Sequence, residues 1–126
     1  MTREDFEQLV EEALALIPQE FLDKLDNVAL VIEDHASKEQ RRQAHLAGNQ
    51  MLFGLYEGIP LVQRGAGYGS VLPDKITIFQ KAIEASCTTR EEVRLKVRDT
   101  VWHEIAHHFG SDEAGARQAG KKANKI

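Results

Sequence analysis

The run His103-Glu104-Ile105-Ala106-His107, inside a long stretch of helix-forming residues, constrains this chain more than any other feature. Residues four apart share one face of an α-helix, so His103 and His107 can direct their imidazoles toward one point. The apolar residues around them fall on the opposite side of the helix: Val101, Trp102, Ile105 and Phe109. The pattern predicts a helix with a buried apolar back and two histidines that face a cleft.

The ends of this helix also have sequence signals. Thr88, with Glu91 three residues later, fits a capping box at the N-terminus. Gly110 fits a stop, because glycine readily adopts the left-handed conformation that ends many helices. We therefore expect a helix from about Thr89 to Phe109.

The two histidines and the glutamate between them suit hydrolysis assisted by a metal ion. Neutral imidazole nitrogen is a good zinc ligand. Glu104 directly follows the first histidine, where it can act as a general base beside the metal without binding it. The alternative is a solvent-facing helix that carries these three residues by chance, and the flanking helix signals favour the site.

A catalytic zinc site takes three protein ligands and leaves a fourth position to water. Gly110 can turn the chain back toward the metal, and Glu113 lies three residues further on, which completes the pattern H-E-x-x-H-x-x-G-x-x-E. Asp112 is the neighbouring alternative. The residues alone leave the choice between these two carboxylates open.

Composition bounds the remaining interpretations. The 126 residues are 42% hydrophobic, which suits one domain over residues 1–126 with a single core. The net charge of −4 gives no sign of nucleic-acid binding. The single cysteine, Cys87, is incompatible with an internal disulfide framework and fits a reducing cytoplasm. Because no apolar run is long enough to span a bilayer, we expect no membrane partner and a cytoplasmic location.

The hydrophobic pattern predicts an α+β fold, with a small mixed β-sheet packed on helices and the H-E-x-x-H helix near the C-terminus. Helices are expected over Thr2–Leu16, just after Pro18, within Ser37–Asn49 and between Phe79 and Thr88. Strands are expected over Val28–Ile32, which reads as buried, and over Met51–Tyr56, Pro60–Gln63 and Lys75–Phe79. The glycine-rich stretch Arg64–Ser70 lacks the spacing of a phosphate-binding loop and is expected to be a plain loop.

Three other side chains have chemistry that could serve such a site. Tyr56 and Tyr68 are each able to donate to a developing oxyanion, but we expect each to lie at a boundary with its hydroxyl in water. His108 points away from the face of the two histidines on a helical wheel, so we expect it to pack or cap rather than bind metal.

Several separated blocks of this chain match a known family in order. They are Leu55–Gly58, Pro60–Leu61, Leu72–Ile76, Thr89–Glu92 and Val101–Gly110, with acidic residues just beyond. Over about Val28 to Glu113 the chain resembles the small bacterial zincin-like metallopeptidases, which have a minimal zincin fold. Ser111 departs from the family's pattern, which often has an apolar residue directly after the glycine.

This resemblance implies a zinc ion held by His103, His107 and Glu113, with Glu104 as the catalytic residue. It also implies an edge strand above the metal helix that binds substrate as an added β-strand, for which Ile76–Phe79 is the candidate. The expected function is zinc-dependent hydrolysis of peptide bonds, with Glu104 as general base and a peptide or protein as substrate.

Two alternatives to a peptidase remain open. One is a metal-stabilised peptide-binding domain without hydrolytic activity, and the other is a zinc hydrolase of a non-peptide amide. The chain is short and offers little material for a second cleft wall, which a homodimer or an unknown protein partner could supply.

Overall fold

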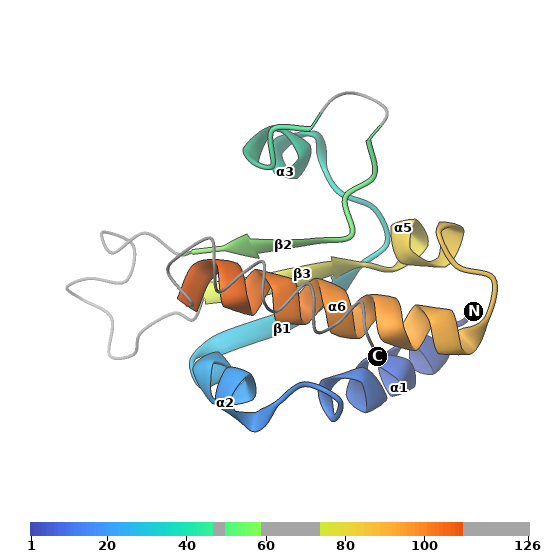
Figure 1. Ribbon diagram of the computed structural model, residues 1–126. Helices are drawn as coiled ribbons and strands as arrows, with labels where there is room; N and C mark the ends of the chain where they lie inside the picture. Colours follow the sequence, from blue (N-terminus) through green and yellow to red (C-terminus); the bar gives the residue numbers. More distant parts are fainter. Residues whose placement is uncertain (47–49, 59–73, 110–126) are drawn as a thin grey trace.

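The computed structural model describes residues 1–46, 50–58 and 74–109, in which helices pack around a small sheet (Figure 1). The helices are α1 (Arg3–Leu14), α2 (Gln19–Leu22), α3 (Lys38–Gln43), α5 (Gln80–Ala85) and α6 (Arg90–Phe109), and a 3-10 turn η1 (Asp23–Leu25) follows α2. The strands are β1 (Val28–Glu33), β2 (Gly54–Glu57) and β3 (Asp74–Phe79). The predicted α+β class is confirmed. The predicted strand Pro60–Gln63 and loop Arg64–Ser70 lie outside the described residues.

The described strands form one mixed sheet with β3 in the centre, in the order β1-β3-β2. β1 runs parallel to β3, and β2 runs antiparallel to it on the other side. The central strand is the more buried one: Ile76–Phe79 of β3 is buried, whereas every residue of β1 is only partly buried. The prediction of a strand over Val28–Ile32 is confirmed, but the prediction that it is buried is wrong, because among the described strands it lies at an edge of the sheet.

The core lies where α6 crosses the sheet with α1 alongside it (Figure 1). α6 contributes the largest share of its buried apolar residues, namely Val93, Val97, Val101, Trp102, Ile105 and Ala106. α1 and the central strand supply much of the rest: Phe6, Leu9, Val10, Ala13, Ile76 and Ile78. Trp102 also meets Phe21 of α2 edge to face, with ring centroids 5.6 Å apart. The predicted apolar back of α6 is thus confirmed.

The N-terminal cap of α6 is Thr89, one residue later than the predicted cap Thr88. The Glu92 N–H donates to the Thr89 hydroxyl at 3.0 Å, while the Glu92 carboxylate accepts from the backbone N–H and the hydroxyl of Thr88 at 3.0 and 2.9 Å. The predicted pairing of Thr88 with Glu91 is therefore wrong. Thr88 with Glu91 and Thr89 with Glu92 have the same spacing, so both pairs fit the capping pattern. Glu91 forms an ion pair with Arg94.

Close contact between β2 and α6 depends on a glycine. A Cβ added at Gly54 would lie 2.5 Å from the Thr100 Cγ2 atom of α6 and 3.3 Å from the Thr77 carbonyl oxygen of β3. Because real Cβ atoms do not approach other heavy atoms that closely, only glycine fits here without a shift. Gly54 thus allows β2 to lie directly against the helix that carries the H-E-x-x-H motif.

None of the helices in the described ranges combines the length and apolar character needed to cross a membrane.

Candidate metal and general-base site

The C-terminal half of α6 carries both histidines on its exposed face. His103 and His107 lie one turn apart, with ring centroids separated by 6.2 Å and ring planes 18° from parallel. Both residues are exposed, whereas Ile105 and Ala106 between them are buried in the core. The predicted orientation of the two histidines, away from the apolar back, is confirmed.

The chemistry of these two side chains fits a zinc ion. Zinc accepts imidazole nitrogen at about 2.0–2.1 Å, and two exposed rings one turn apart can approach a common ion by side-chain rotation alone. Over residues 1–46, 50–58 and 74–109, no group of three or more His, Cys, Asp or Glu side chains is placed to hold a metal. Glu113 and Asp112 lie outside the described residues. The third ligand therefore stays a prediction.

Glu104 is half-buried and turns toward the sheet. Its Oε1 atom accepts a hydrogen bond of 3.2 Å from the backbone N–H of Tyr56 in β2. Burial raises the pKa of Glu104 above its ordinary value, and the Tyr56 N–H and the nearby His107 oppose that rise. A carboxylate with a raised pKa is a stronger proton acceptor, which is the property that a general base needs.

Tyr56 connects this helix end to the sheet through its side chain as well. Its hydroxyl donates to Asp74 Oδ2 at 2.5 Å, and its ring stacks on His108 with centroids 3.7 Å apart. The prediction that the Tyr56 hydroxyl lies in water is wrong, because pairing of β2 with β3 brings the Asp74 carboxylate within reach. The packing role predicted for His108 is confirmed, and burial lowers the pKa of its imidazole, with His107 adding to the effect. Tyr68 lies outside the described residues.

The predicted substrate-binding strand is also corrected. Ile76–Phe79 belongs to β3, which has a strand on each side, so its backbone groups are already used in the sheet. β2 is the edge strand next to α6, and within the described part of the chain no strand pairs with its outer side. The Tyr56 N–H on that side donates to Glu104.

The sequence did contain a signal for Tyr56, which donates to Glu104, and for Asp74, which accepts from the Tyr56 hydroxyl. Tyr56 lies in the block Leu55–Gly58 and Asp74 in the block Leu72–Ile76, both of which carry the family resemblance. That the two blocks meet beside α6 depends on the pairing of β2 with β3. The pairing of β2 with β3 joins segments far apart in the chain, so local sequence patterns do not predict it.

Comparisons with known proteins identify the family and the fold of this chain. The sequence profile of the zincin-like metallopeptidase family matches residues 25–120, which is most of the chain. The chain therefore belongs to the zincin-like metallopeptidase family, and the resemblance found in its sequence is confirmed.

A solved structure, that of a conserved hypothetical protein from Thermus thermophilus, has a similar fold with a TM-score of 0.57. The similarity covers 87% of this chain and 95% of that one at 21% sequence identity, so it concerns the fold alone. A comparison with curated protein sequences finds no match.

Proposed function

We propose that this protein is a zinc-dependent metallopeptidase in which His103, His107 and Glu113 bind the metal and Glu104 is the general base. The observation that carries the proposal is the position of Glu104. Its half-buried carboxylate lies beside the exposed histidine pair and accepts a hydrogen bond from the edge strand β2. Membership of the zincin-like metallopeptidase family supports the same conclusion.

The proposed reaction divides metal binding and proton transfer among these residues. His103 and His107 hold the zinc ion through neutral imidazole nitrogens, and Glu113 completes the set of protein ligands. A bound zinc ion supplies the charge that makes water acidic near neutral pH. Glu104 accepts the proton of the attacking water, and its raised pKa suits that role. It then returns the proton to the nitrogen of the departing amine.

Among the described residues no strand pairs with the outer side of β2, and this side suits an extended peptide as substrate. A peptide added along this edge uses main-chain hydrogen bonds, which recognise any sequence, while side-chain pockets add preference. Because Tyr56 of this strand holds the Glu104 carboxylate, a peptide bound along β2 has its backbone next to the proposed base. This assigns to β2 the role that the sequence predicted for Ile76–Phe79.

The decisive experiment compares wild type with Glu104→Gln, both loaded with zinc, on a broad peptide library read by mass spectrometry. Glutamine nearly matches the shape of glutamate but does not accept the water's proton, so we expect retained zinc and a rate lower by about 10²–10⁴. Glu91→Gln, a change at the far N-terminal end of the same helix, is the matched control and should cleave like wild type.

Three outcomes would contradict the proposal. If wild type cleaves no peptide that Glu104→Gln spares, the metal-stabilised binding domain becomes the better interpretation. If the wild-type protein instead hydrolyses small non-peptide amides in the same kind of assay, the protein is a hydrolase but its substrate is not a peptide. Loss of zinc in Glu104→Gln would make Glu104 a ligand.

A further inference from the structure

The face of α6 that carries the two histidines continues toward the N-terminus of the helix. Lys96 and Thr100 precede His103 by seven and four positions, so their side chains lie on the same face as His103 and His107. Lys96 and Thr100 are partly buried, whereas the histidines are exposed. At 1.5 Å per residue, Lys96 lies about 10 Å from His103 along the helix axis. The face with the proposed metal ligands thus also carries a cation, two turns before His103.

The segment that contains β2 runs along this face of α6. Three contacts occur in the same order along both: they join Phe53 to Lys96, Gly54 to Thr100 and Tyr56 to Glu104. β2 and α6 therefore run in the same direction (Figure 1). The Lys96 ammonium lies 4.0 Å from the centroid of the Phe53 ring. Phe53 precedes Tyr56 by three positions, or about 10 Å of extended chain, so the ammonium lies beside the proposed substrate strand at that distance from the proposed base.

The backbone groups of β2 indicate where a peptide would bind. The Phe53 carbonyl accepts from the Phe79 N–H at 2.9 Å, so it faces β3. Because backbone groups alternate between the two sides of a strand, those of Gly54 and Tyr56 point to the outer side of β2. The bond from the Tyr56 N–H to Glu104 agrees with this alternation. A peptide on the outer side would therefore bond to Gly54 and to the Tyr56 carbonyl, next to α6.

The Lys96 ammonium has no acidic partner in the part of the chain that the structure describes, where no ion pair includes it. Glu92 and Asp99 lie at ion-pair spacing from it on the helix, but both are engaged elsewhere. Glu92 accepts from Thr88, and Asp99 pairs with Arg98 at 2.8 Å. An ammonium has three N–H donors, and the face of one aromatic ring does not use them all. A substrate carboxylate can bind the remaining donors.

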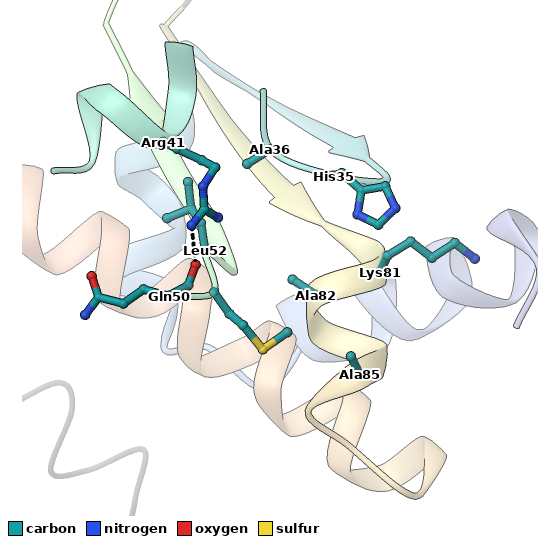
Figure 2. A pocket seen from close by; sticks show the side chains of 9 residues that line it. His35, Ala36, Arg41, Gln50, Leu52, Lys81, Ala82 and Ala85 are labelled. Atoms are coloured by element: carbon teal, nitrogen blue, oxygen red, sulfur yellow. Dashed lines mark hydrogen bonds between the residues drawn. The ribbon is translucent and has the colours of Figure 1, made fainter. Parts of the chain in front are cut away.

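The ring under the ammonium is held in place from two sides. Three residues before it, the Gln50 carbonyl accepts from the Arg41 guanidinium at 2.6 Å (Figure 2). Phe53 itself is bonded through its carbonyl to the central strand, and its side chain packs against the hydrophobic core. A cation that rests on a fixed ring is partly positioned before a ligand arrives, so binding costs less entropy.

We propose that Lys96 sets a substrate preference by pairing with an acidic side chain two or three residues after the bond that is cut. The proposal rests on the proposed function, since it takes a peptide bound along β2 as the substrate. Antiparallel pairing is the commoner arrangement, and a peptide antiparallel to β2 has its C-terminal part next to Phe53 and Lys96. The cut bond lies by Glu104, opposite Tyr56, so roughly three residues of extended peptide separate it from the ammonium.

Another role for Lys96 is to cover the Phe53 ring without touching a substrate, because the stem of a lysine shields apolar surface and its charge attracts the ring face. Two variants separate these roles. Lys96→Met keeps an apolar stem over the ring but removes the charge. Lys96→Arg keeps both the charge and the contact with the ring.

The cut sites in the peptide library described above test the preference. In wild type we expect aspartate and glutamate to be about fivefold enriched over asparagine and glutamine at the second or third position after the cut, as for an ion pair at a partly exposed site. Lys96→Arg should keep this enrichment. Lys96→Met should remove it while neutral peptides are cut at the wild-type rate. Lys96→Glu should reverse it in favour of lysine and arginine.

Arg90→Gln is the matched control, because Arg90 is an exposed cation in the first turn of the same helix, on a different face from Lys96. It removes the same charge and should leave the enrichment unchanged. An enrichment that is absent in wild type, or that persists in Lys96→Met, would overturn the proposal and leave Lys96 only the role of supporting Phe53. An enrichment before the cut instead of after it would overturn the assigned position.

Binding to zinc-loaded Glu104→Gln protein distinguishes failure of this inference from failure of the proposed function. The probes are fluorescein-labelled octapeptides that alternate threonine with glutamate or with glutamine, and their affinities are measured by fluorescence anisotropy. An alternating peptide can place glutamate next to Lys96 by a shift of one position along β2. We expect the glutamate peptide to bind about fivefold more tightly, and added Lys96→Met to remove the difference.

The two assays together separate the outcomes. Cleavage without any charge preference would leave the peptidase function in place and refute the role of Lys96. If wild type cleaves nothing but the difference in binding is found, this inference holds and the proposed peptidase function fails. If wild type cleaves nothing and the two octapeptides bind equally, or neither binds, the inference fails as well.

Discussion

At the scale of single residues, the position of the proposed base depends on Gly54. It lets β2 approach α6, and two residues later the Tyr56 N–H reaches the Glu104 carboxylate. A glycine with no side chain thereby helps to set the position of a carboxylate on another element.

Gly54→Ala should therefore destabilise the protein and weaken the contact between Tyr56 and Glu104. The new methyl group would meet the Thr100 Cγ2 atom, and overpacking of this kind costs about 1–3 kcal/mol. Urea unfolding gives the free energy, and peptide hydrolysis reports on the site. Adding Thr100→Ser removes the opposing methyl but keeps the hydroxyl that bonds to the Lys96 carbonyl at 2.7 Å, so it should restore much of the loss. No rescue by Thr100→Ser would show that this contact is not the cause.

The Tyr56 hydroxyl gives a second test at this scale. Tyr56→Phe keeps the ring that stacks on His108 and the N–H that binds Glu104, but removes the 2.5 Å hydrogen bond to Asp74. We expect a loss of about 1 kcal/mol in unfolding free energy and a hydrolysis rate within a few-fold of wild type. A rate loss of a hundredfold or more at unchanged stability would instead assign the hydroxyl to the transition state.

At the scale of secondary-structure elements, local patterns account for most of the predictions that are confirmed. The helices after Thr2 and Pro18, the strand after Asn27 and the helix with the apolar back all appear close to their expected positions. Helix caps and hydrophobic periodicity are properties of neighbouring residues, so the sequence displays them directly. The strand order is not accessible in this way, because pairing joins segments far apart in the chain. The error over Ile76–Phe79 is an example.

The N-terminus of α6 provides a prediction about pH. Hydrogen bonds from the backbone and the hydroxyl of Thr88 lower the pKa of Glu92 from its ordinary 4.5. A carboxyl whose pKa is lower in the folded state contributes stability above its unfolded pKa, and that contribution is lost as pH falls through the folded value. Wild type should therefore melt at a higher temperature than Glu92→Gln at neutral pH, and the gap should narrow below about pH 4.5.

Melting curves from about pH 3 to about pH 7, a range that spans the titration of a carboxyl group, would measure this gap. Thr88→Val removes only the hydroxyl donor, so it should reproduce part of the gap in melting temperature between wild type and Glu92→Gln. A gap that is independent of pH would mean that Glu92 stabilises the helix through packing rather than through its charge.

At the scale of the whole molecule, family and fold agree, and the metal is the next quantity to measure. We expect one zinc ion per chain, because the sequence contains a single cluster with ligand spacing. Elemental analysis after zinc reloading would count it. His103→Ala and His107→Ala should abolish tight binding, while His45→Asn should not. His45 is exposed and has a φ of 56°, a conformation that asparagine tolerates.

The same assay addresses the third ligand. Glu113→Ala should weaken zinc binding far more than Asp112→Ala, since Glu113 occupies the position three residues beyond Gly110 that the family resemblance implies. Comparable losses, or a larger loss at Asp112, would reassign the ligand. If the wild-type chain, with both histidines and both carboxylates intact, binds no zinc, the proposed metal site is refuted. The single domain, the cytoplasmic location and a partner or second copy that completes the cleft stay predictions.

Two contacts join residues that lie far apart in the sequence, and this separation has a consequence for synthesis on the ribosome. Tyr56 and Glu104 are 48 positions apart, and the bond between Glu12 of α1 and Arg94 of α6 spans 82. Since α6 supplies much of the apolar core, the earlier segments have little to pack against until that helix has been translated. In the nascent chain, Glu104 can therefore reach its position beside Tyr56 only after α6, the last described helix, has left the ribosome. With the proposed peptidase activity, the site would gain its active arrangement only after the rest of the described fold has been translated and can pack around α6.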